Sequence, residues 1–188
     1  MDFYDVIKNR RSCRVFKPDP IPTDALERIT EAATWAPSGK NRQNYRIFVV
    51  AGDKKNELVA IADRSFPLIE SSLKEIYDEK IVSFTRNFFR TLGGAPVLLV
   101  FYSDPTEEGQ FVDTQTVSAA VQNALLAAAH EDLGTCWMTN PVHLKDEVDK
   151  VLGVEGMDLM AFVPIGYPGK EPPVPPRKEG RVHWIGFG

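Results

Sequence analysis

Hydrophobic residues along this 188-residue chain follow two patterns, one typical of helices and one typical of buried strands. In several segments apolar side chains recur every three or four positions, which places them on one face of a helix. This spacing predicts helices over 2–7, 23–36, 54–62, 113–132 and 144–152. Short uninterrupted apolar runs predict strands over 46–51, 97–102, 135–140 and 159–167. The first of these strands is expected to be buried on both faces from Ile47 onward.

Residues 66–92 mix polar and apolar positions, and their phenylalanines recur at roughly helical spacing. The segment predicts one or two helices. Two roles are open for its apolar side chains, since they can fill the core or cover a substrate pocket as a lid.

The predicted helix 113–132 is apolar on nearly all of its faces, which is typical of a buried helix. In a chain this short, such a helix lies at the centre of the domain or is pressed against a second subunit.

The C-terminal residues 168–188 differ in composition, because Pro168, Pro172, Pro173, Pro175 and Pro176 exclude a packed helix. An extended tail is predicted. A tail with no core of its own must lie on another surface, and residues 182–185 could add an edge strand.

Alternating strands and helices predict a layered α+β or α/β arrangement, and the length fits a single domain over 1–188. A net charge of −4 and a pI near 5.4 argue against a general nucleic-acid binder. No apolar run is long enough to span a bilayer, and no signal-peptide layout is found at the N-terminus. Two distant cysteines and isolated histidines give no metal motif. We therefore expect a cytoplasmic protein without a metal, a membrane partner or a nucleic-acid partner.

The segment Arg10-Arg11-Ser12-Cys13-Arg14 gathers three guanidinium groups and a hydroxyl at the end of the first predicted helix. Guanidinium donors match the geometry of phosphate oxygens, so the cluster can grip the phosphate of a nucleotide-like cofactor. The alternative is a solvated basic face.

Residues 36–45 form a polar loop that includes Pro37, Ser38, Gly39 and Asn41. Its hydroxyl and amide groups both donate and accept hydrogen bonds, which suits the edge of a pyrimidine-like ring. The alternative is a loop that caps only its own turns. Glycine-rich phosphate motifs of the usual kinds are absent, so a cofactor would be held by scattered groups.

Six segments, in collinear order over nearly the whole chain, resemble the nitroreductase-like flavoproteins. They are residues 10–16, 36–43, 95–100, 119–128, 134–137 and 165–168, followed by Arg177 near the end. The resemblance implies a three-layer α+β sandwich with a central, mostly antiparallel sheet flanked by helices. It also implies an obligate homodimer, completed by the extended tail, with FMN at the subunit interface.

Further implications of the resemblance concern individual residues. Arg10, Arg11, Ser12 and Arg14 would line the phosphate and pyrimidine sides of one FMN, and Arg177 would add to the phosphate grip. Pro37, Ser38, Gly39 and Asn41 would come from the other subunit. Met138, Thr139 and Asn140 would run past the flavin ring, with a backbone N–H facing its N5 atom.

The implied reaction is a ping-pong oxidoreduction in which the flavin carries the redox chemistry and no side-chain nucleophile is needed. NADH or NADPH would reduce the flavin, and a flat, electron-poor small molecule such as a nitroaromatic or a quinone would then accept the electrons. Arg14 is expected to stabilise negative charge on the reduced ring. The alternatives are a flavin carrier or sensor, and another FMN-dependent dehydrogenase on the same scaffold.

Two departures from the family pattern are visible. The family commonly has Gln-Pro-Trp where this chain has Gln43-Asn44-Tyr45, which leaves the shape of that loop open. Residues 66–92 lie where the family varies most, and the full residue set of its iodotyrosine-dehalogenating branch is not found.

Overall fold

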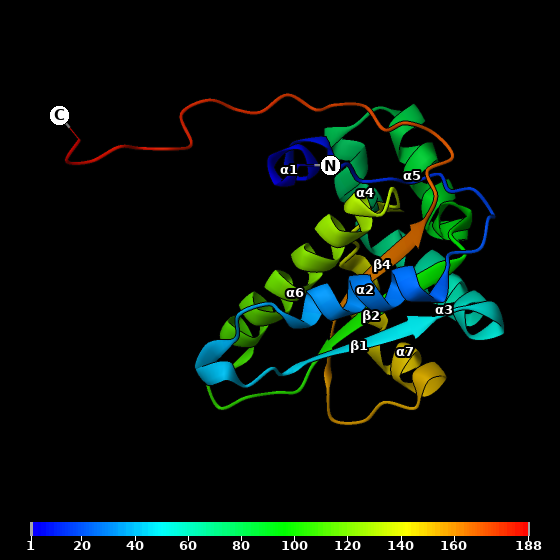
Figure 1. Ribbon diagram of the computed structural model, residues 1–188. Helices are drawn as coiled ribbons and strands as arrows, with labels where there is room; N and C mark the ends of the chain where they lie inside the picture. The colour runs from blue at the N-terminus through cyan, green and yellow to red at the C-terminus, as the bar shows by residue number, and fades with distance from the viewer. Residues whose placement is uncertain (1, 188) are drawn as a thin grey trace.

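The computed structural model describes residues 2–187, and at its centre lies an antiparallel sheet with the strand order β1-β2-β4-β3 (Figure 1). The strands are β1 (Tyr45–Val50), β2 (Val97–Ser103), β3 (Gly134–Thr135) and β4 (Asp158–Gly166). The α-helices are α1 (Phe3–Asn9), α2 (Thr23–Thr34), α3 (Gly52–Ser65), α4 (Pro67–Ile76), α5 (Glu79–Thr91), α6 (Gln110–His130) and α7 (Lys145–Leu152). Three short 3₁₀ turns are η1 (Gly39–Asn41), η2 (Leu92–Gly94) and η3 (Asn140–Leu144).

Helices cover both faces of the sheet, which explains why every residue of β2 is buried. Successive side chains of a strand point to opposite faces. Leu98, Val100 and Tyr102 accordingly join the core formed with α3, α5 and α7. Val97, Leu99 and Phe101 join the core formed with α2 and α6. The predicted three-layer α+β architecture is confirmed.

The segment 66–92 contains two helices, α4 and α5, and part of its apolar residues fill the core. Val82, Phe88 and Phe89 of α5 are buried in the core. Ile81 and Phe84, on another side of the same helix, are exposed at the rim of a cavity.

The expectation that the first strand is buried on both faces is wrong. In the described sheet β1 is an edge strand that pairs only with β2, and Val49 is 48% exposed. The apolar run of β1 therefore resembles that of a central strand, although Val49 on one of its faces is exposed.

The prediction of a strand over 135–140 is wrong beyond Thr135, where β3 ends. Regular pairing of β3 with β4 ends at Thr135, and only an isolated bridge joins Met138 to Phe162. The physical cause is Pro164, which lies between these points on β4. Its carbonyl accepts from the Cys136 N–H at 3.3 Å, but proline has no N–H to return.

The edge strand suggested at 182–185 is also wrong, because residues 171–187 form no strand or helix. In Figure 1 this part of the chain runs away from the layered body. None of the helices described between residues 2 and 187 is long and apolar enough to cross a membrane.

A pair of valine substitutions tests the difference between the edge strand and the central strand. Val100→Ala, at a fully buried position of β2, should lower the free energy of unfolding by roughly 2–3 kcal/mol, since it removes buried methyl groups and leaves a cavity. Val49→Ala on β1 should cost about 1 kcal/mol or less. Urea unfolding at one protein concentration measures both, and equal losses would contradict the exposure of Val49 on β1.

Candidate cofactor-binding site

The arginine-rich segment is held extended by backbone hydrogen bonds to three other parts of the chain. The Cys13 N–H donates to the Thr135 carbonyl, the Phe16 N–H to Gly93 and the Lys17 N–H to Tyr167, each at 2.8 Å. Side chains from 10 to 14 therefore project from a fixed backbone.

Two glycines allow this segment to approach closely. A Cβ on Gly134 would lie 2.7 Å from the Cys13 Cβ, and a Cβ on Gly93 would lie 2.4 Å from the Arg14 carbonyl oxygen. Gly93 also has a φ of +66°, which L side chains rarely adopt. Both positions thus require glycine if the arginine segment is to keep its place.

Arg10 and Arg11 line a cavity of about 320 Å³, here called the arginine cavity, between the end of α1, residues 129–134 and the start of the tail. Burial lowers the pKa of Arg10, and the positive charges of Arg177 and Arg11 lower it further. Arg177 of the tail is thus close enough to Arg10 for their charges to interact, although it does not line the cavity.

The guanidinium groups at this cavity lack protein counter-ions. Asp132 and Glu171 line the cavity, but within residues 2–187 no carboxylate forms an ion pair with Arg10, Arg11 or Arg177.

Arg11 is held in place by its Nη1, which donates to the Arg10 carbonyl at 2.7 Å, while its buried Nε has no partner in the described chain. An unsatisfied buried donor is unfavourable, so these residues fit an anionic ligand.

Arg14 faces a second, larger cavity of about 650 Å³, here called the aromatic cavity. Its guanidinium lies 5.9 Å from the centre of the Phe88 ring. The remaining lining residues are Ile69, Leu73, Tyr77, Ile81, Phe84, Thr85, Phe89, Cys136, Trp137, Met138, Thr139, Asn140 and His143. Gly134 lines the arginine cavity and Cys136 lines the aromatic cavity, so that a single residue, Thr135, separates the two linings along this stretch of the chain.

The predicted ring-contacting residues line the aromatic cavity, but two of them are already engaged. The Met138 N–H donates to the Phe162 carbonyl at 2.8 Å. The Asn140 side chain donates to the carbonyl of Ser65 at 2.6 Å and to its hydroxyl at 3.0 Å. Thr139 is exposed at the cavity, and its N–H donates to no other group within residues 2–187.

The predicted loop residues Pro37, Ser38, Gly39 and Asn41 lie elsewhere. Gly39 sits beside Val112 in the first turn of α6, whereas Ala129 near the other end of α6 lines the arginine cavity. These two helix positions are 17 residues apart, or roughly 25 Å at about 1.5 Å per residue. Within one chain, the loop and the arginine segment do not meet.

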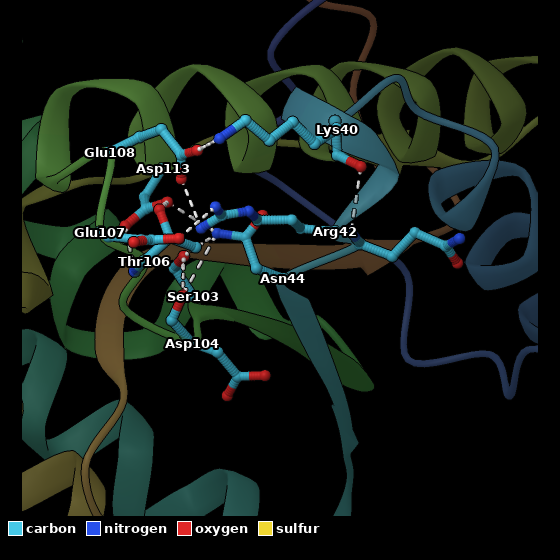
Figure 2. A network of polar contacts seen from close by, with 11 residues as sticks. Lys40, Arg42, Asn44, Ser103, Asp104, Thr106, Glu107, Glu108 and Asp113 are labelled. Carbon is cyan, nitrogen blue, oxygen red and sulfur yellow. Dashed lines mark hydrogen bonds and ion pairs between the residues drawn. The ribbon is translucent and has the colours of Figure 1, made fainter.

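A buried polar network that the sequence analysis missed stands behind this loop (Figure 2). The Asp113 carboxylate accepts hydrogen bonds from the Asn44 side chain at 2.9 Å and from Thr106. The available signal was an acidic residue at the start of a helix whose buried side is mostly apolar.

A large exposed apolar surface lies on the outer side of α6. Phe3 and Trp35 are 64% and 79% exposed, and with Leu126 and Ala127 they border a hollow of about 560 Å³. Exposed apolar patches of this kind mark interaction surfaces.

The two thiols and the candidate metal ligands contribute no further site. Burial raises the pKa of both Cys13 and Cys136, which favours the unreactive thiol over the thiolate. Among the described residues no three His, Cys, Asp or Glu side chains gather in a way that could hold a metal ion.

An α+β sandwich with an arginine-lined cavity beside an aromatic-lined cavity defines a protein suited to a ligand that carries both an anionic group and a flat ring. A family model described as "Nitroreductase family" matches residues 7–167. The chain belongs to the nitroreductase family.

Its relatives include proteins named for two different reactions. The iodotyrosine deiodinase of Thermotoga neapolitana is 31% identical over 190 residues, covering 98% of each chain. Nitroreductase NfnB of Mycolicibacterium smegmatis is 25% identical, covering 86% of this chain and 81% of the relative. A crystal structure of oxidized iodotyrosine deiodinase, bound to FMN and 3-iodo-L-tyrosine, is 28% identical with a TM-score of 0.77, covering 99% of this chain and 100% of that chain.

Two adjacent glycines provide a test of how the arginine segment is held. Gly93→Ala and Gly94→Ala both place a side chain at positive φ, at a cost of roughly 1–2 kcal/mol. Gly93→Ala should lose roughly 1–3 kcal/mol more, because its Cβ overlaps the Arg14 backbone while that of Gly94 has its nearest neighbour at 3.8 Å. Denaturant unfolding compares the two variants, and equal losses would show that the close contact is unimportant.

Proposed function

We propose that this protein is an FMN-dependent NAD(P)H oxidoreductase that acts as a homodimer on a flat, electron-poor acceptor. The observation that carries the proposal is the arginine cavity, which Arg10 and Arg11 line without a protein counter-ion and where the buried Arg11 Nε has no partner in the described chain. FMN combines a phosphate with a planar ring system, and the linings of the arginine cavity and the aromatic cavity include residues that are neighbours along the chain, Cys13 and Arg14.

Arg10, Arg11 and Arg177 would hold the phosphate, because guanidinium pairs with phosphate oxygens through directed hydrogen bonds. Ser12, whose backbone lies beside Thr135, would add a hydroxyl along the path between the cavities. The ring would lie in the aromatic cavity beside Arg14 and the stretch Met138–Asn140. When bound there, FMN supplies the exchange of electrons between the nicotinamide donor and the acceptor.

Arg14 and Thr139 would act on the ring by electrostatics and hydrogen bonding. A fixed guanidinium stabilises negative charge that develops nearby. Since the Met138 N–H is engaged by Phe162, the Thr139 N–H is the candidate donor to the ring edge.

The distance between the arginine cavity and the loop with Pro37, Ser38, Gly39 and Asn41 supports a dimer. If the loop with Pro37, Ser38, Gly39 and Asn41 contacts FMN, it must do so in a partner subunit, because roughly 25 Å separates it from the arginine cavity of its own chain. The exposed apolar surface on α6, Phe3 and Trp35 offers a face for such a partner.

The lining of the aromatic cavity supports a neutral acceptor. Most of its residues are aromatic or aliphatic, and none of the described residues that line it is Asp or Glu. The ammonium group of an amino-acid substrate would therefore be left without a counter-ion. A quinone or a nitroaromatic compound avoids this cost, so we favour these acceptors over iodotyrosine.

The visible spectrum of the purified protein tests this proposal. We expect a flavin spectrum that NADH or NADPH bleaches under nitrogen and that a quinone or nitroaromatic then restores. Addition of 3-iodotyrosine to the bleached protein is the matched comparison and should restore the spectrum far more slowly.

A flavin that neither nicotinamide bleaches would favour a carrier or sensor. A colourless protein that takes up no FMN would refute the proposal, and rapid recovery with 3-iodotyrosine would refute the assignment of the acceptor.

Mixed dimers test the shared site. Arg10→Ala and Asn41→Ala homodimers should each retain FMN poorly, because every site carries one defect. A dimer with one Arg10→Ala chain and one Asn41→Ala chain contains one intact site and one doubly defective site. Flavin content after tandem-affinity purification and dialysis should therefore be one FMN per dimer.

The matched control pairs a wild-type chain with a chain that carries both substitutions, which leaves no intact site if the two halves come from different subunits. If both halves instead come from the same chain, the two results exchange places.

A further inference from the structure

We propose that Asp113 and Asn44 are positioning residues that hold the loop 37–43 in the shape needed to complete the partner subunit's FMN site. The inference rests on the proposed function. It assigns a role to two residues that lie behind the loop and do not line either cavity.

Asp113 joins two segments that come from different parts of the chain (Figure 2). Its carboxylate is 2% exposed. One oxygen accepts from the Asn44 amide at 2.9 Å and from the Thr106 hydroxyl at 2.6 Å, and the other accepts from the Thr106 N–H at 2.9 Å. The side chain thereby ties the end of the loop 37–43 to the connection between β2 and α6.

Asn44 is fixed by its backbone as well as by its side chain. Its carbonyl accepts from the Asp104 N–H at 2.7 Å, and its amide also donates to the Ser103 hydroxyl at 2.9 Å. The next residue, Tyr45, donates from its hydroxyl to the carbonyl of Thr34 at the end of α2. Asn44 and Tyr45, which stand where the family commonly has Pro-Trp, therefore both form hydrogen bonds that anchor the loop.

The anchors matter because the loop has an unfavourable backbone. Lys40, Asn41 and Gln43 have φ values of 52°, 54° and 49°. Each such conformation costs a non-glycine residue about 1–3 kcal/mol, and it persists only where surrounding contacts impose it. Inside the loop, the Ser38 hydroxyl accepts from the Gln43 N–H at 2.9 Å.

Ion pairs on the outside of the loop support the same shape but are individually weaker. Lys40 pairs with Glu108 at 2.9 Å, and Arg42 pairs with Glu107 at 2.8 Å and also with Glu108. Exposed pairs contribute little each. The buried carboxylate is the contact whose loss leaves unsatisfied groups behind, so its removal should release the loop.

The test compares FMN affinity with stability. Asp113→Asn keeps the size of the side chain but places an amide where Thr106 donates. We expect the dissociation constant of FMN, measured by quenching of flavin fluorescence on titration of the apoprotein, to rise about tenfold, which corresponds to a lost buried hydrogen bond. The melting temperature should fall as well.

Tyr102→Phe is the matched control, since it removes another buried hydrogen bond, to Asp149 at 2.7 Å, from the opposite face of the sheet. It should lower the melting temperature and change the FMN dissociation constant by less than about twofold, because no loop of the site depends on it.

A double substitution separates positioning from general destabilisation. If Asp113 acts through the loop, Asn41→Ala should weaken FMN binding much less in the Asp113→Asn protein than in the wild type. If Asp113 only stabilises the fold, the two effects multiply. Should Asp113→Asn fail to fold, Thr106→Val, which removes one hydrogen bond to the same carboxylate, takes its place in both measurements.

An unchanged FMN affinity in Asp113→Asn, an equal loss in Tyr102→Phe, or multiplying effects in the double variant would each overturn the positioning role. These outcomes differ from failure of the proposed function, in which the wild-type protein itself binds no FMN.

Discussion

Mutual repulsion among clustered guanidinium groups is the constraint around which this structure is built. Burial lowers the pKa of Arg10, the charges of Arg177 and Arg11 lower it further, and no carboxylate in the described chain pairs with these three residues. Such an arrangement is unfavourable without an anion, so the fold must hold it by other means. Backbone hydrogen bonds from Cys13, Phe16 and Lys17 do so, and they reach β3, η2 and the end of β4. The segment that carries Arg10 and Arg11 is therefore fixed by main-chain pairing, which charge repulsion on the side chains cannot easily break.

The length of α6 gives the molecule two separate ends. One end carries the arginine cavity and the other carries the strained loop with its buried Asp113 network. The arginines at one end lack a protein counter-ion, whereas the strained loop at the other end is held in shape by hydrogen bonds and ion pairs within its own chain. Between the two ends runs the outer side of α6, where exposed apolar side chains gather with Phe3 and Trp35. A symmetric partner on that face would bring the arginine end of α6 in one subunit near the loop end of α6 in the other. The proposed FMN site therefore depends on the proposed dimer.

The sequence predicted the elements well where a local signal was strong. The fully apolar strand β2 and the long helix α6, rich in small residues, were predicted because residues close together in each sequence segment are buried together. The errors arise from partners distant in sequence. Nothing local in β1 shows that it has a neighbour on one side only, and nothing local in 135–140 shows that Pro164 of β4 lies opposite. The cluster of Arg10, Arg11 and Arg14 was recognisable because these residues are close together in the sequence. The Asp113 network was not, since Asn44 and Asp113 are 69 residues apart and neither segment shows that it contacts the other.

The helix α5 illustrates why periodicity alone cannot assign function. Its apolar residues recur at one spacing, yet Val82 lies only in the core, Ile81 and Phe84 lie only at the aromatic cavity, and Phe88 and Phe89 belong to both. A helix that must satisfy both surfaces is apolar over a wide arc, and the sequence does not mark where core ends and cavity begins. Ile81 and Phe84 lie outside the buried core, so changes at these two positions can alter the cavity without removing core side chains, whereas changes at Phe88 or Phe89 affect both surfaces. In a family whose relatives are named for nitro reduction and for deiodination, this half-buried helix is where a difference in acceptor can arise at little cost to the fold.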